Sequence, residues 1–263
     1  MSRPLLPLLI VGNKNYSSWS LRGWLLLKQF NIEFEEQLIQ LFDSLAKPTL
    51  KQYSATGKVP VLVINRNNRT DDNQNNPQIC VTDSLSIGLF ANDYLTDLDI
   101  WSGLIKSDID KDNDLLQKQR AFCQSIVSEM HSSFNGVRNE MPMNVRATAK
   151  INPSESCLAD LDRIEDIFEQ CLQGADLSKQ TDCYLFGKFT IADAFYAPVV
   201  LRLKTYTEHS GLKLRATTKQ YMDVMLSNPY IQDWVKNALQ ETRIIKENEA
   251  GEILSLEGVL GSF

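Results

Sequence analysis

The sequence predicts a mixed α/β domain followed by an all-helical domain, and three observations support this. Short apolar runs typical of buried strands alternate with helical segments over residues 1–96. From residue 101 onward the strand signals vanish, and apolar residues recur at helical spacing. The length of 263 residues suits one large domain or two modest ones. We therefore expect domains at residues 1–96 and 101–263.

The opening elements predict a β-α-β unit. An apolar run at residues 5–11 ends at Gly12 and indicates a buried strand. Residues 21–30 are apolar nearly all round, which predicts a well-buried helix. A second strand begins at Phe34. This order implies a parallel pair of strands with a right-handed crossover.

Two more strands and a helix complete the predicted first domain. Residues 58–64 and 80–82 read as strands, and a helix runs over residues 83–95. The asparagine-rich segment 65–78 separates the two strands. Its composition predicts a solvated hairpin loop.

The second domain is predicted to be a bundle of helices without strands. Apolar residues at spacings of three and four place one long helix over residues 122–141. Further helices are expected over 158–171, 189–203 and 231–238. The tail after Arg243 has no clear periodicity.

Composition excludes several functions. The net charge of −6 argues against non-specific binding to nucleic acid or to anionic membranes, because both need a positive field. The five cysteines form no CxxC pair and the two histidines have no zinc-ligand spacing, so we expect no metal and a reduced compartment. The apolar run near the N-terminus is too short for a membrane span and is interpreted as a strand.

A serine-rich segment between the first strand and the first helix is the first candidate site. Ligands of β-α-β units bind against this helix N-terminus, where free N–H groups and a partial positive charge stabilise an anion. A thiolate is such an anion, and thiol pKa values of ~8.5 fall to roughly 3.5–7.5 at such sites. A serine hydroxyl would add a hydrogen bond to sulfur. The alternative, which spacing alone favours, is that Ser17, Ser18 and Ser20 only cap the helix.

Three further segments combine capping residues and proline. Pro60 in Lys58-Val59-Pro60 marks an edge, a start or a bend of a strand. Asp83-Ser84 fits a helix cap, although a helix start beside a carboxylate can also hold an α-amino and α-carboxylate pair. The stretch from Thr190 to Asp193 has the form of a capping box and is interpreted as structural, with Asp193 hydrogen-bonded rather than catalytic.

Together these segments resemble the cytosolic glutathione transferase superfamily, and its bacterial serine-type, zeta-like members in particular. The resemblance spans roughly residues 5–240. It is carried by YSSWSLR at residues 16–22, GKVPVL at 57–62, TDS at 82–84 and LFGKFTIAD at 185–193. It implies a thioredoxin-like, glutathione-binding domain at residues 1–96. The helical domain, residues 101–263, would carry the electrophile side of the site.

The resemblance also implies residue roles. Ser17 is the first candidate for the thiolate partner and Ser18 the second. The loop of Lys58, Val59 and Pro60 would bind glutathione, with Val59 pairing by its backbone before a cis-proline. Asp83 and Ser84 would hold the γ-glutamyl end.

A second glutathione-lining segment is implied in the long helix. Residues 128–131, with Ser128 and His131, resemble a stretch of bacterial beta-class enzymes that lines the glutathione site. His131 would contact glutathione or the electrophile, with an interface histidine of no chemical role as the alternative. The electrophile would lie near Met130, His131 and Phe134.

The expected protein is therefore a cytoplasmic, homodimeric detoxification enzyme that attacks a small electrophile with glutathione as co-substrate. A glutathione-dependent isomerase or reductase and a non-catalytic binding module of the same fold are the alternatives. Trp19 stands where zeta-class isomerases carry cysteine, which disfavours isomerisation of maleylacetoacetate. A cysteine in place of Ser17, expected for thiol exchange, is absent.

Overall fold

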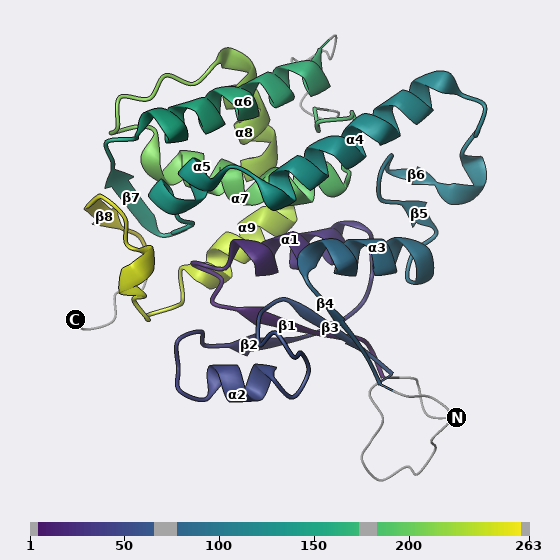
Figure 1. Ribbon diagram of the computed structural model, residues 1–263, viewed down its shortest axis with the longest axis horizontal. Helices are drawn as coiled ribbons and strands as arrows, with labels where there is room; N and C mark the ends of the chain where they lie inside the picture. The colour runs from purple at the N-terminus through teal and green to yellow at the C-terminus, as the bar shows by residue number, and fades with distance from the viewer. Residues whose placement is uncertain (1–4, 66–77, 174–182, 259–263) are drawn as a thin grey trace.

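The computed structural model describes residues 5–65, 78–173 and 183–258 of the chain. A four-stranded sheet with its helices forms the N-terminal part, and a set of helices covers it on one side (Figure 1). This arrangement is the predicted one. The boundary at residues 96–101 stays a prediction, because helices of the second part pack directly on the first.

The sheet has the strand order β2-β1-β3-β4. The central strand β1 (Leu8–Gly12) pairs in parallel with β2 (Glu35–Ile39), which confirms the predicted β-α-β unit. On its other side β1 pairs antiparallel with β3 (Val61–Ile64), which in turn pairs antiparallel with β4 (Ile79–Thr82). Of the asparagine-rich segment between β3 and β4, residues 66–77 lie outside the described residues.

Helices cover both faces of the sheet. The helices α1 (Ser18–Gln29) and α3 (Ser84–Tyr94) lie on the face toward the helical part, and α2 (Ala46–Leu50) lies on the opposite face (Figure 1). Nine of the twelve residues of α1 are buried, as its apolar sequence predicts. This burial fixes the start of α1, which faces the site described below.

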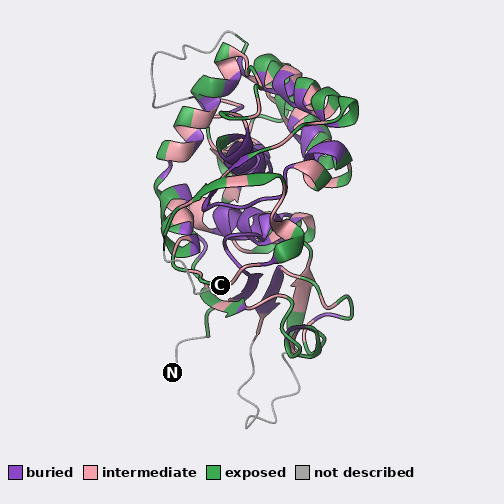
Figure 2. Ribbon diagram, turned by 90° about the vertical axis from the view of Figure 1, so that its left-hand side faces the viewer, coloured by how far each residue is buried: buried purple, intermediate pink, exposed green. Residues whose placement is uncertain are grey.

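The helical part is organised around α7, which is buried along nearly its whole length (Figure 2). It packs against α1 of the first part and α4 of the second. A capping box of Thr190 and Asp193 begins α7, as predicted. The described residues of this part form α4 (Asp114–Ser132), α5 (Asn135–Glu140), α6 (Glu155–Leu172), α7 (Ile191–Tyr206), α8 (Ala216–Ser227) and α9 (Pro229–Ala238).

The prediction of a single helix over residues 122–141 is wrong, because the helix is interrupted between α4 and α5. Ser133 is extended, and Phe134 has a left-handed backbone with φ of +63°. A Cβ atom on Gly136 would lie 2.8 Å from the backbone of Cys157, so α5 approaches the start of α6 closely. The apolar spacing continues across the break because both helices face the same core.

The prediction of no strands after residue 101 is also wrong in detail. A two-residue ladder joins β5 (Leu98–Asp99) to β6 (Leu104–Ile105), which η1 (Lys106–Asp108) follows. The C-terminal tail, after η2 (Lys246–Asn248), forms β8 (Glu252–Leu256) and pairs antiparallel with β7 (Ala147–Lys150). The tail thus folds back over the molecule. Within the described ranges, no helix has the length and apolar character needed to cross a membrane.

Candidate functional site

A cavity of about 650 Å³ lies where the sheet part, the helical part and the C-terminal tail meet. This volume falls in the range of small-molecule sites. From the sheet part it is lined by the start of α1, by α2 with the loop before it, and by the loop that ends at Val59. From the helical part and the tail it is lined by Arg138, Pro142, Met143, Arg202, Ile245 and Asn248.

Ser17 and Ser18, the predicted thiolate partners, both line this cavity and are both largely buried. Ser17 is the N-cap of α1, because its Oγ accepts a hydrogen bond from the N–H of Ser20 (3.3 Å). It also donates to the Oγ of Ser20 (2.8 Å), which accepts from Gly12 N–H as well (2.9 Å). Ser17 therefore caps α1, as one of the two interpretations of the sequence predicted. It also lines the cavity, where its hydroxyl can meet a ligand.

Ser18 lies beside a guanidinium group of the helical part. Its Oγ accepts a hydrogen bond from Nη2 of Arg202 (3.3 Å). Arg202 Nη1 donates to the carbonyl oxygen of Met141 (2.6 Å) and to those of Val137 and Arg138 (both 3.3 Å). Arg202 therefore caps the last turn of α5. Burial, with the neighbouring charge of Arg138, lowers the pKa of Arg202 to about 10.

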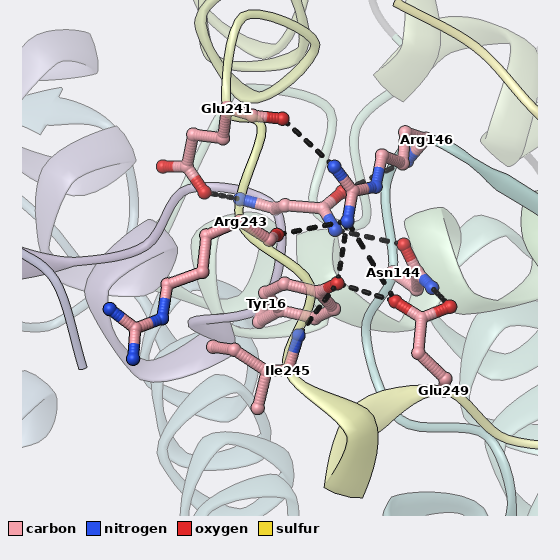
Figure 3. A network of polar contacts seen from close by, with 8 residues as sticks. Tyr16, Asn144, Arg146, Glu241, Arg243, Ile245 and Glu249 are labelled. Carbon is pink, nitrogen blue, oxygen red and sulfur yellow. Dashed lines mark hydrogen bonds and ion pairs between the residues drawn. The ribbon is translucent and has the colours of Figure 1, made fainter. Parts of the chain in front are cut away.

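The neighbouring Tyr16 is held by a buried polar network and has no free hydroxyl (Figure 3). Its oxygen accepts from Arg146 Nη2 (2.8 Å) and from the N–H of Ile245 (3.3 Å), and it donates to Glu249. Burial and the Glu249 carboxylate raise the pKa of this phenol. Tyr16 is therefore a structural residue that anchors the tail.

The same network holds the C-terminal tail over the start of α1. Glu241 accepts from the backbone N–H groups of Lys14 (2.5 Å) and Asn15 (3.3 Å). Arg146 donates to the carbonyl oxygens of Glu241 (2.8 Å) and Arg243 (2.9 Å). These contacts position Ile245 and Asn248 on the cavity wall. Sequence reasoning missed this wall because the tail carries no periodic signal.

Lys58 and Val59 also line the cavity, and the Val59–Pro60 peptide bond is cis. Pro60 is buried and precedes β3, as its position at a strand start predicted. The backbone N–H and C=O of Val59 have no hydrogen-bond partner in the described part of the chain. A peptide ligand in the cavity could therefore pair with them.

Asp83 and Ser84 do not line the cavity itself but form the start of α3. The Asp83 carboxylate accepts from the N–H groups of Leu85 (2.7 Å) and Ser86 (3.4 Å). Its backbone has φ of +79°, a conformation that costs a non-glycine residue energy and that is often found at functional sites. The Ser84 Oγ is buried and has no hydrogen-bond partner among the residues that the structure describes. A buried hydroxyl without a partner is uncommon and suits a ligand.

His131 and Ser128 both lie on α4, where His131 is half-buried and Ser128 is exposed, and neither lines the cavity. The Nε2 atom of His131 is 3.6 Å from the Asp83 carboxylate, and its ring meets the Trp19 ring edge-on at 5.2 Å. Burial lowers the pKa of His131. The other residues predicted near the electrophile, Met130 and Phe134, are buried in the core and do not line the cavity.

The sequence analysis also missed three arginines that lie near Trp19 or Ser18. Arg22 and Arg138 place their guanidinium carbons 4.5 Å and 5.0 Å from the centre of the Trp19 ring. Arg202 reaches Ser18, as described above. They come from α1, α5 and α7, so no local sequence pattern joins them.

Comparisons with known proteins agree with the fold. Residues 16–93 match the family model of the glutathione S-transferase N-terminal domain. No curated protein matches the chain in sequence. Similar solved structures include a glutathione transferase homolog from Burkholderia with bound glutathione, at 16% identity and a TM-score of 0.58, covering 88% of this chain and 97% of that one.

Two further structures have the same TM-score of 0.58 at 15% identity. Glutathione transferase Omega 3C from Trametes versicolor is matched over 93% of each chain. A glutathione S-transferase from Rhodospirillum rubrum is matched over 93% of this chain and 96% of that one. These similarities confirm the predicted fold, a thioredoxin-like domain followed by a helical part.

Proposed function

We propose that this chain is a glutathione transferase that binds glutathione in the cavity at the start of α1 and activates its thiol for attack on a small electrophile. The match of residues 16–93 to the family model and the bound glutathione in the Burkholderia relative support this. The observation that carries the proposal is the pair of buried hydroxyls of Ser17 and Ser18 on the cavity wall.

Ser17 is the proposed hydrogen-bond donor to the glutathione sulfur. The hydroxyls of Ser17 and Ser20 share one hydrogen bond, and Ser20 has no other acceptor in the described chain. If the Ser20 hydroxyl turns and donates to Ser17, the Ser17 proton is free to face the cavity. Both hydroxyls then keep their partners, and a thiolate receives a hydrogen bond from Ser17 and a favourable field from the α1 N-terminus.

Ser18 is the proposed second donor. Its oxygen already accepts from Arg202, so its own proton is free to point toward an anion. The guanidinium charge next to it would stabilise the thiolate further. Catalysis would come mainly from this electrostatic environment and from positioning of the thiolate.

The remaining parts of glutathione fit the unpaired groups of the sheet part. The free backbone of Val59 suits the cysteinyl unit. The unpartnered Ser84 hydroxyl suits the γ-glutamyl carboxylate, and the exposed side of the Asp83 carboxylate suits the amine. Lys58 lines the cavity beside Val59 and suits the glycyl carboxylate. His131 would support the γ-glutamyl end through Asp83, whereas exposed Ser128 has no contact that supports a role.

A homodimer in the cytoplasm with a role in detoxification is the remaining part of the proposal. The helix α3 leaves Leu89 and Tyr94 exposed by 45% and 73%, which supports a partner on that face. Light scattering of the purified protein tests this, and a monomer at micromolar concentration would contradict it.

Calorimetric titration with glutathione tests the proposed function. We expect binding to wild-type protein and a proton release that reports formation of the thiolate. A panel of an aryl halide, maleylacetone and hydroxyethyl disulfide then separates transferase, isomerase and reductase activities. No measurable binding of glutathione would favour a non-catalytic module instead.

A further inference from the structure

The helical wall of the cavity carries more positive charge than the proposed thiolate needs. Arg138 and Arg202 both line the cavity, and Arg22 lies behind Trp19, which also lines it. Within the described residues, no carboxylate forms an ion pair with these three guanidinium groups, and Asp83 and Asp160 act on the pKa of Arg22 and of Arg138 only from a greater distance. Burying charged groups without opposite charges is costly.

Arg22 is the most deeply buried of the three arginines. The residue is 1% exposed, and its Nε and Nη1 atoms are buried with no hydrogen-bond partner in the described part of the chain. It is held between the aromatic rings of Trp19 and Phe195, at 4.5 Å and 5.0 Å from their centres. Burial and the nearby charges of Arg138 and Arg202 lower the pKa of Arg22 well below its ordinary value.

Arg138 lines the cavity from the helical side. Its Nε donates to the carbonyl oxygen of Ser133 (2.8 Å) and its Nη2 donates to that of Met130. These contacts fix the guanidinium plane at the end of α4. They leave Nη1 without a partner among the residues that the structure describes.

The charges of the two cavity walls suggest different ligands. The sheet-side wall carries Lys47 and Lys58, which can take the glycyl carboxylate of glutathione. The helical wall carries Arg138 and Arg202, next to the serines where sulfur would react. A carboxylate of the other substrate is therefore the anion that suits this wall.

We propose that the helical wall binds a carboxylate of the electrophile through Arg138, beside the charge of Arg202, so that the preferred second substrates are small organic acids. Arg138 would donate to this carboxylate from Nη1, because its Nε and Nη2 already donate to carbonyl oxygens. Arg22 strengthens the positive field from behind Trp19. This inference rests on the proposed function for the identity of the cavity.

Calorimetry with benzoate and its neutral analogue benzamide tests the carboxylate subsite in the full-length protein without glutathione. We expect benzoate to bind at least about tenfold more tightly than benzamide. Arg138→Met should abolish this preference and leave benzamide affinity unchanged. Lys204→Met is the matched control, because it removes one positive charge from an exposed position on α7, and it should keep the preference.

Arg138→Lys and glutathione titrations separate the possible outcomes. Arg138→Lys retains the charge and should keep part of the preference, even if Arg138→Met does not fold. Equal affinities for benzoate and benzamide in the wild type, or a preference that survives in Arg138→Met, would overturn the inference. An equal loss of glutathione and benzoate binding in Arg138→Met would assign the arginine to glutathione and also overturn it.

The same titrations keep this inference separate from the proposed function. Glutathione binding without a benzoate preference would refute only the carboxylate subsite. A benzoate preference without glutathione binding would refute only the proposed function.

Discussion

Replacement of Ser17 by alanine should raise the thiol pKa of bound glutathione. In the proposed site the Ser17 hydroxyl donates one hydrogen bond to a negatively charged sulfur. Hydrogen bonds to charged groups contribute about 1.5–3 kcal/mol, and each pKa unit corresponds to about 1.4 kcal/mol. Ser17→Ala should therefore raise the pKa by about 1–2 units and lower turnover at neutral pH roughly ten- to hundredfold.

The ultraviolet absorbance of the thiolate, followed across pH in the complex with glutathione, measures this shift. Ser17 also caps α1 through its contact with Ser20 N–H, so Ser17→Ala should cost about 0.5–2 kcal/mol of stability. The folded fraction must therefore be measured alongside. Ser17→Thr keeps both the hydroxyl and the cap, and it should keep the wild-type pKa.

The comparison with Ser18→Ala decides which serine acts. If Ser17→Ala left the pKa of bound glutathione unchanged while Ser18→Ala raised it, the Ser17–Ser20 argument would be refuted and Ser18 would be the donor. If neither variant changed the pKa, activation of sulfur by a serine would be refuted altogether.

Three further predictions concern the neighbouring residues. Ser84→Ala should weaken glutathione binding about tenfold in calorimetry without loss of stability, because the Ser84 Oγ is buried without a partner; unchanged affinity would contradict its role. Tyr16→Phe should lower the free energy of unfolding by about 1–3 kcal/mol in urea, because Arg146 and Ile245 lose their acceptor, and an unchanged midpoint would contradict this. The His131 imidazole should titrate below about 6.5 in NMR spectra assigned with His131→Gln, because burial lowers its pKa. The contribution of neutral His131 to stability is then fully present above about pH 6.5 and is lost as the pH falls through the pKa of His131 in the folded protein. An NMR titration midpoint of His131 at or above about 6.5 would contradict the prediction.

Local patterns predicted the parts of the fold that local forces decide. The apolar run of α1, the proline before β3 and the capping box at Thr190 each depend on neighbours within a few residues. The order of these segments also identified the start of α1 as the candidate site.

Long-range contacts decided what the sequence could not predict. The break at Phe134 follows from the close approach of α5 to α6 at Gly136, which helical spacing does not reveal. The tail strand β8 exists because β7 offers it an edge more than a hundred residues earlier in the chain. Arg22, Arg138 and Arg202 are ordinary helix residues in the sequence, and only the packing of three helices brings them together near Ser18 and Trp19.

A crystal structure of the protein with glutathione tests the central claim most directly. The account predicts that the glutathione sulfur lies within hydrogen-bond distance of the Ser17 Oγ at the start of α1. A sulfur atom that faces away from both serines, or a cavity that stays without glutathione at saturating concentration, would contradict it.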